Sequence, residues 1–164
     1  MIYFAYGSNM STQRMTSRVP SAELKGTATL FQHKLAFHKI SKKDGSGKCD
    51  AYETEDPEDK ILGVLYQINP KEKSLLDRHE GYRYGYDIKN VSLINPLGEN
   101  IDAFTYYATN IDTSLKPYSW YLQHILSGMK EHRFPSYYIE FLKSVESVKD
   151  MDQERERNEL SIYY

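Results

Sequence analysis

The chain has 164 residues, with 21 lysines and arginines against 23 aspartates and glutamates and a net charge of -2. This length suits one domain that buries a core without disulfides or metals. The charge argues against a nucleic-acid-binding surface, and no apolar run approaches the roughly 20 residues that span a membrane. The N-terminus lacks the basic region of a signal peptide, and the single cysteine, Cys49, fits a reducing compartment. We therefore expect a cytoplasmic protein.

Runs of β-branched and aromatic residues predict strands in the first part of the chain. Residues 2–6 form a short run that ends at a glycine, and residues 23–30 and 34–40 form two longer runs. We expect the latter two to pair with each other across a turn near residues 32–33. The polar stretch 42–48 contains two glycines, which predicts a loop.

The middle of the chain carries the strongest strand signals. Residues 61–68 are apolar on both faces, as in a central buried strand. Residues 86–94 and 101–109 flank a segment rich in turn residues, 95–100, and are predicted to form a hairpin.

Helix start and stop signals follow the strands. Asn69 can cap a helix, Pro70 suits its first position, and Gly81 stands where a glycine ends it. Pro117 and Pro135 each precede a further helical pattern. The apolar residues on one face are Leu122, Ile125, Leu126 and Met129 in the first pattern, and Tyr138, Phe141, Leu142 and Val145 in the second.

The order of these elements predicts the fold class. Strands come first and helices cluster late, which favours an α+β protein over a parallel doubly wound sheet. A strongly curved, partly closed barrel with helices packed on its side fits the pattern. We expect one domain over residues 1–148 and a charged C-terminal tail over residues 149–164, either a solvated helix or a frayed end.

The loop after the first strand is a candidate binding site. Tyr6, Gly7, Ser8 and Asn9 lie between a strand and a helix start at Ser11, so several backbone N–H groups point in one direction. Glycine lets the backbone approach a ligand, and such a junction can hold a carboxylate or a developing oxyanion. A plain tight turn is the competing interpretation. Ser8 as a nucleophile is a further alternative, although the G-x-S-x-G frame is absent.

One carboxylate is placed where helices disfavour it. Glu80 lies at the C-terminal end of the helix that Asn69 starts, facing the negative end of the helix dipole. Functional sites often break such local rules, and a carboxyl group there can take and return a proton. A solvated surface glutamate is the alternative, and Asp77, one turn earlier, is the competing candidate.

The remaining reactive residues carry weaker signals. The five histidines have no metal-ligand spacing, so we expect packing or surface roles and no metal site. Cys49 has no visible base to activate it. The lysines around Gly45 and Gly47 lack the phosphate-loop frame, which favours a solvated loop. Tyr121, in the helix after Pro117, could point its hydroxyl at a ligand or pack in the core.

The order of these motifs resembles the γ-glutamylcyclotransferase family, whose fold is also called AIG2-like or BtrG-like. The resemblance covers about residues 2–145, and the pairing of Y-G-S-N with a downstream L-D-x-x-E-G is its specific part. The matching segments are residues 3–10, 44–48, 63–66, 76–82, 117–121, 128–131 and 135–138.

The resemblance implies a small mixed β-barrel with peripheral helices and an enzyme that cyclises a γ-glutamyl amide to 5-oxoproline, releasing an amino acid or amine. It implies that Glu80 is the general acid/base and that Tyr6, Gly7, Ser8, Asn9 and Tyr121 bind substrate. We expect a small-molecule γ-glutamyl substrate, no cofactor, no nucleic-acid or membrane partner, and a monomer or homodimer. A γ-glutamylamine or γ-glutamyl-antibiotic-intermediate cyclotransferase, or a non-catalytic binding protein, are the alternatives. Whether Tyr84 or Tyr86 faces the site is left open.

Overall fold

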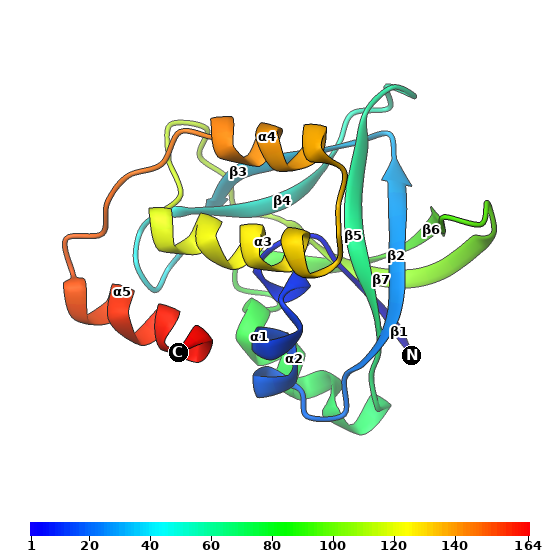
Figure 1. Cartoon of the computed structure of the whole chain (residues 1–164), viewed down its shortest axis with the longest axis horizontal. Helices are drawn as coiled ribbons and strands as arrows, with labels where there is room; N and C mark the ends of the chain where they lie inside the picture. The colour runs from blue at the N-terminus through cyan, green and yellow to red at the C-terminus, as the bar shows by residue number, and fades with distance from the viewer.

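A closed barrel of five strands forms the centre of the structure, a computed structural model that describes residues 1–164 (Figure 1). Neighbouring strands pair antiparallel, except that β1 (Ile2–Ala5) closes the barrel against β7 (Asn100–Ala108) in parallel. The barrel is therefore mixed, and the predicted α+β class with peripheral helices is confirmed. In barrel order the strands are β1 (Ile2–Ala5), β5 (Lys60–Gln67), β2 (Glu23–Phe31), β6 (Tyr86–Ile94) and β7 (Asn100–Ala108).

The predicted central strand, β5, lies between β1 and β2 and packs tightly against its neighbours. Phe4 and Ala5 of β1 are fully buried, and a Cβ atom on Gly63 would lie 2.4 Å from the Phe4 ring. Only glycine allows the two strands this approach. The hairpin predicted around residues 95–100 is also present, and β6 and β7 pair from Tyr86 with Ala108 to Ile94 with Asn100.

The predicted pairing of residues 23–30 with residues 34–40 is wrong. Strand β2 pairs with β5, whereas β3 (His33–Ile40) leaves the barrel and pairs with β4 (Gly47–Glu53) in a separate two-stranded sheet. Gln32, between β2 and β3, has a φ of 60°, in the left-handed region. This conformation turns the chain out of the barrel instead of into a hairpin along β2.

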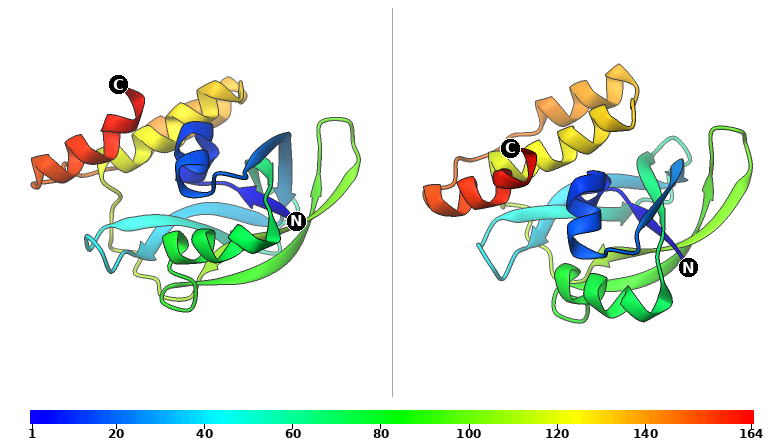
Figure 2. Two further views of the ribbon diagram at one scale, coloured as in Figure 1. Left: turned by 90° about the horizontal axis from the view of Figure 1, so that it is seen from below. Right: turned by 60° about the horizontal axis from the view of Figure 1, so that its bottom comes forward.

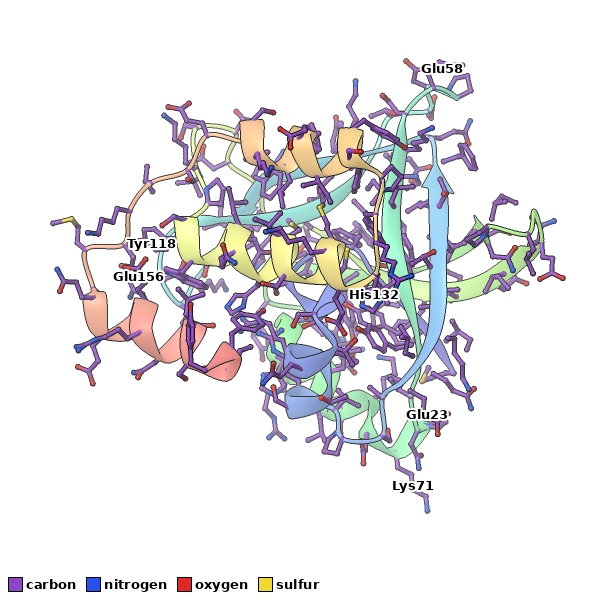
Figure 3. All side chains as sticks on the ribbon, in the orientation of Figure 1. Glu23, Glu58, Lys71, Tyr118, His132 and Glu156 are labelled. Carbon is purple, nitrogen blue, oxygen red and sulfur yellow. The ribbon has the colours of Figure 1, made fainter.

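The helices cover one side of the barrel and the end where the N-terminal loop lies (Figures 1 and 2). Asn69 caps a short 3-10 turn that leads into α2 (Lys73–Glu80), which ends at Gly81 with a φ of 70°, so both predicted signals are confirmed. Figure 3 shows His132, directly after α3 (Ser119–Glu131), beside the strands, and its Nε2 lies 2.9 Å from the Met10 carbonyl oxygen. None of the helices has the length and apolarity needed to cross a membrane. The helices are α1 (Thr12–Arg18), α2 (Lys73–Glu80), α3 (Ser119–Glu131), α4 (Ser136–Ser144) and α5 (Gln153–Leu160).

The charged C-terminal segment packs against α3, and the C-terminus lies near α1 (Figure 1). No residue of α5 is fully buried, yet Glu159 accepts a 2.9 Å hydrogen bond from Arg14 of α1. The same carboxylate lies 3.4 Å from Nε2 of the buried His124 of α3 and 3.6 Å from the Lys43 ammonium. The Tyr163 hydroxyl contacts the other His124 ring nitrogen at 2.8 Å.

The Glu159 cluster predicts a pH-dependent contribution to stability. His124 and Arg14 hold the pKa of the Glu159 carboxyl well below its usual range. The carboxylate therefore contributes its stabilisation above the unfolded value of about 4.3 and loses it as the pH falls further. We expect Glu159→Gln to lower the free energy of unfolding by about 1 to 2 kcal/mol at pH 7, because Arg14 loses its partner.

Urea unfolding between pH 7 and pH 3 measures this effect. The difference between wild type and Glu159→Gln should shrink as the pH falls below about 4. Glu154→Gln is the matched control, since Glu154 is exposed on the same helix and forms no ion pair. A constant difference across the pH range would contradict the role given to the Glu159 charge.

Candidate active site

The N-terminal loop and the end of α2 meet in the folded chain. The Asn9 side-chain amide donates a 2.7 Å hydrogen bond to Glu80 Oε1 across 71 residues of sequence. The loop is a 3-10 turn, Ser8–Met10, and the Ser11 hydroxyl caps α1 as predicted. The structure thus brings together the two sequence motifs that had been identified separately.

Arg18 completes a three-residue network around Glu80. Its guanidinium donates to Asn9 Oδ1 at 2.7 Å and lies 3.5 Å from Glu80 Oε1. A guanidinium only donates and a carboxylate only accepts, so these two partners determine the orientation of the Asn9 amide. Both contacts reach Oε1, and Oε2 of Glu80 has no hydrogen-bond partner in the chain. One oxygen is therefore held in place while the other is free for a ligand.

A small inner recess of about 20 Å³ lies beside this network. Gly7 borders it, and a Cβ atom there would lie 3.2 Å from Cys49 Cβ and 3.4 Å from the Tyr121 hydroxyl. The backbone N–H of Gly7 donates to no acceptor of the chain. The recess is lined by Tyr3, Tyr6, Gly7, Ser8, Asn9, Cys49, Glu80, Tyr86, Tyr106 and Tyr121.

The aromatic wall of the inner recess is neutral and anchored. Burial raises the pKa of Tyr3, Tyr6, Tyr86 and Tyr121 well above the ordinary tyrosine value. Tyr6 donates to the Tyr106 carbonyl at 2.7 Å, and Tyr121 accepts from the Cys49 N–H at 3.1 Å. These hydroxyls therefore stay protonated at neutral pH and hold the shape of the recess.

Two alternative nucleophiles have no activating partner. Burial raises the pKa of the Cys49 thiol to about 12, so it remains a thiol at neutral pH. Ser8 lines the recess, but no histidine forms a hydrogen bond with its hydroxyl.

Asp77, the competing carboxylate, is bound to Lys73 at 2.6 Å and to the Tyr106 hydroxyl at 2.5 Å. Asp77 does not line the inner recess.

A larger outer chamber of about 380 Å³ opens from the same residues. Ser8, Glu80, Tyr86 and Tyr121 line both spaces. Three carboxylates border the chamber, from Asp44, Glu80 and Glu159. Against them stand seven basic side chains: Arg14, Arg18, Lys39, Lys42, Lys43, Lys48 and Arg78. The chamber is thus strongly basic in a chain whose net charge is negative.

Tyr84 and Tyr86 differ in their burial and in which of the two spaces they line. Tyr86 is buried, lines both spaces and donates to the Cys49 carbonyl oxygen, whereas Tyr84 is 72% exposed and borders only the outer chamber.

The loop 42–48, expected to be solvated, forms part of the chamber wall. Its Lys48 ammonium pairs with Asp44 at 2.8 Å and lies over the Trp120 and Tyr121 rings.

Several pocket residues carry no local sequence signal. Arg18, Lys39 and Glu159 lie on a helix, a strand and the charged tail, and none belongs to a motif. Their positions depend on which elements pack together. The alternation of strand residues does not assign a face to Lys39, because β3 has one extra residue relative to β4 between Ala36 and Lys39.

Comparison with known proteins identifies the family to which the chain belongs. Residues 60–142 match the model of the AIG2-like family. The γ-glutamylcyclotransferases of Mus musculus and Homo sapiens are each 34% identical to the chain over 150 residues, covering 88% of it and 78% of each relative. The chain belongs to the γ-glutamylcyclotransferase family. It is accordingly an enzyme of that type with a small γ-glutamyl substrate, as the sequence resemblance predicted.

Solved structures agree with this family. A structure described as a γ-glutamyl cyclotransferase superposes with a TM-score of 0.87 at 30% identity, covering 99% of this chain and 97% of the other. The coverage includes α5 as well as the barrel, so the γ-glutamylcyclotransferase likeness extends beyond the residues that carried the sequence resemblance.

Proposed function

We propose that Glu80 is the general acid/base of an intramolecular cyclisation. The α-amino group of a γ-glutamyl compound attacks its own γ-carbonyl carbon, and the carbon–nitrogen bond to the leaving group breaks. The products are 5-oxoproline and a free amine or amino acid. Glu80 takes a proton from the ammonium and returns one to the leaving nitrogen. The observation that carries this assignment is the Asn9–Glu80 hydrogen bond, which holds Oε1 and leaves Oε2 free.

The inner recess supports a binding role for the loop residues Tyr6, Gly7, Ser8 and Asn9 and for Tyr121. A recess of about 20 Å³ accepts one oxygen atom of a substrate, and the free Gly7 N–H borders it. A donor at that place would stabilise a carbonyl oxygen as it gains charge. Holding the glutamyl chain bent is the remaining requirement, since a well-oriented intramolecular attack has an effective molarity of about 10⁵ M or more.

The basic outer chamber supports a leaving group that carries a negative charge. Seven basic side chains against three carboxylates favour a γ-glutamyl amino acid over a γ-glutamylamine, whose leaving group has no carboxylate.

The cytoplasmic location, the monomeric or homodimeric state and the division of the chain at residue 148 stay predictions from the sequence.

A substrate panel tests the proposal. The purified protein is incubated with γ-glutamyl-alanine, glutathione and a γ-glutamyl-alkylamine, and 5-oxoproline is followed by mass spectrometry. We expect release from at least one amino-acid conjugate, faster than from the alkylamine. No release from any compound, together with a rise in melting temperature on binding one of them, would point to a binding protein and contradict the catalytic proposal.

A further inference from the structure

One basic side chain of the outer chamber differs from the others. Lys39 is only 8% exposed, and its ammonium forms no ion pair and no hydrogen bond within the chain. A largely buried charged side chain normally has a partner, because desolvation without one is costly. The Lys39 ammonium is not sealed in the core but opens to the outer chamber. Of the other six, Lys42 and Arg78 are exposed, and Arg14, Arg18, Lys43 and Lys48 each face a carboxylate.

The surrounding backbone makes room for the Lys39 side chain. Strand β3 has an extra residue relative to β4 between Ala36 and Lys39, a bulge of the kind that re-aims side chains beside functional sites. Gly85 has a φ of 152°, and a Cβ atom there would lie 2.9 Å from Lys39 Cε and 3.2 Å from Nζ. The ammonium lies 4.6 Å from the centre of the Tyr86 ring. The position of Lys39 therefore depends on a bulge, a glycine and an aromatic ring.

The charged groups near Lys39 shift the pKa of its ammonium in opposite directions. Burial lowers the pKa of its ammonium, and Lys42 acts in the same direction, whereas Glu80 and Asp44 act to raise it. Asp44 is already paired with Lys48, and Glu80 is held by Asn9 and Arg18. Neither carboxylate forms an ion pair or a hydrogen bond with Lys39, so its ammonium has no direct partner within the chain.

We propose that Lys39 binds the carboxylate of the departing amino acid and so selects amino-acid conjugates over amine conjugates. This inference rests on the proposed cyclotransferase reaction. Lys39 borders the outer chamber but not the inner recess, where the loop residues and the free Gly7 N–H lie. With the glutamyl portion held at the recess, the leaving group extends into the chamber toward Lys39. A charge-assisted hydrogen bond formed there is among the stronger ones.

Three matched substrates test the role of Lys39. γ-Glutamyl-alanine carries the carboxylate, γ-glutamyl-ethylamine lacks it, and γ-glutamyl-alaninamide replaces it with a neutral group of similar shape. We expect wild type to prefer the alanine conjugate in kcat/KM by about 10- to 100-fold. Lys39→Met should remove this preference mainly through a higher KM, since the contact exists before and during reaction. Lys39→Arg should restore part of it.

The control is Lys34→Met, on the same strand, because Lys34 is exposed and paired with Asp59 at 3.3 Å. Thermal unfolding checks that each variant is folded, and the wild-type comparison of the three substrates stands even if Lys39→Met does not fold. Equal loss on all three substrates, or no wild-type preference between alanine and alaninamide, would overturn the proposal. A wild type that releases no 5-oxoproline from any substrate would instead contradict the cyclotransferase function itself.

Discussion

Glu80→Gln is expected to lower kcat by about 10²- to 10⁴-fold, the range typical of losing a general acid/base. Glutamine keeps the size of the side chain, and its carbonyl oxygen can still accept the Asn9 hydrogen bond. The variant should therefore fold and bind substrate, while losing the group that carries the proton between the two nitrogens. Because the lost interaction belongs to the reaction itself, KM should change much less than kcat.

Asp77→Asn is the matched comparison for the Glu80 variant. Asp77 lies on the same helix, but both of its contacts are structural, to Lys73 and to the Tyr106 hydroxyl. We expect this variant to lose some stability and to keep most of its rate of 5-oxoproline release. A folded Glu80→Gln protein that remains nearly as active as wild type would remove Glu80 from the mechanism. The same result combined with an inactive Asp77→Asn protein would transfer the role to Asp77.

Gly128→Ala is expected to destabilise the protein by about 3 kcal/mol, toward the upper end of overpacking costs. A Cβ atom on Gly128 of α3 would lie 2.6 Å from the Met10 carbonyl carbon and 2.7 Å from the Ser11 nitrogen. Both are backbone atoms of the loop that carries Asn9, so the loop must move. Alanine gains about 1 kcal/mol of helix propensity over glycine, which offsets only part of the clash.

The displaced loop should also lower activity, because Asn9 positions Glu80. Urea unfolding and 5-oxoproline release on the same preparation measure the two effects together. Gln123→Ala, at an exposed position of α3, is the control and should change stability by less than about 0.5 kcal/mol. A Gly128→Ala protein as stable and active as wild type would show that the loop tolerates the shift, and that α3 does not hold the site in place.

The sequence by itself determined the features that depend on short stretches of chain. The cap at Asn69, the stop at Gly81, the central strand β5 and the β6–β7 hairpin follow from backbone preferences and hydrophobic patterns within a few residues. The loop at residues 6–9 and the glutamate at a helix C-terminus were also recognisable. Each is a local pattern, and in the glutamate's case a local departure from what helices favour.

The tertiary structure alone decided which of these features meet. The contact between Asn9 and Glu80 spans 71 residues, and β2 and β3 pair with β5 and β4 rather than with each other. Lys39 and Glu159 reached the pocket through the same long-range packing. Such pairings depend on barrel closure and on the burial of apolar surface across the whole chain, and no short segment encodes them. The residues that we propose to react and to bind were therefore recognisable in the sequence, whereas the chamber that surrounds them was not.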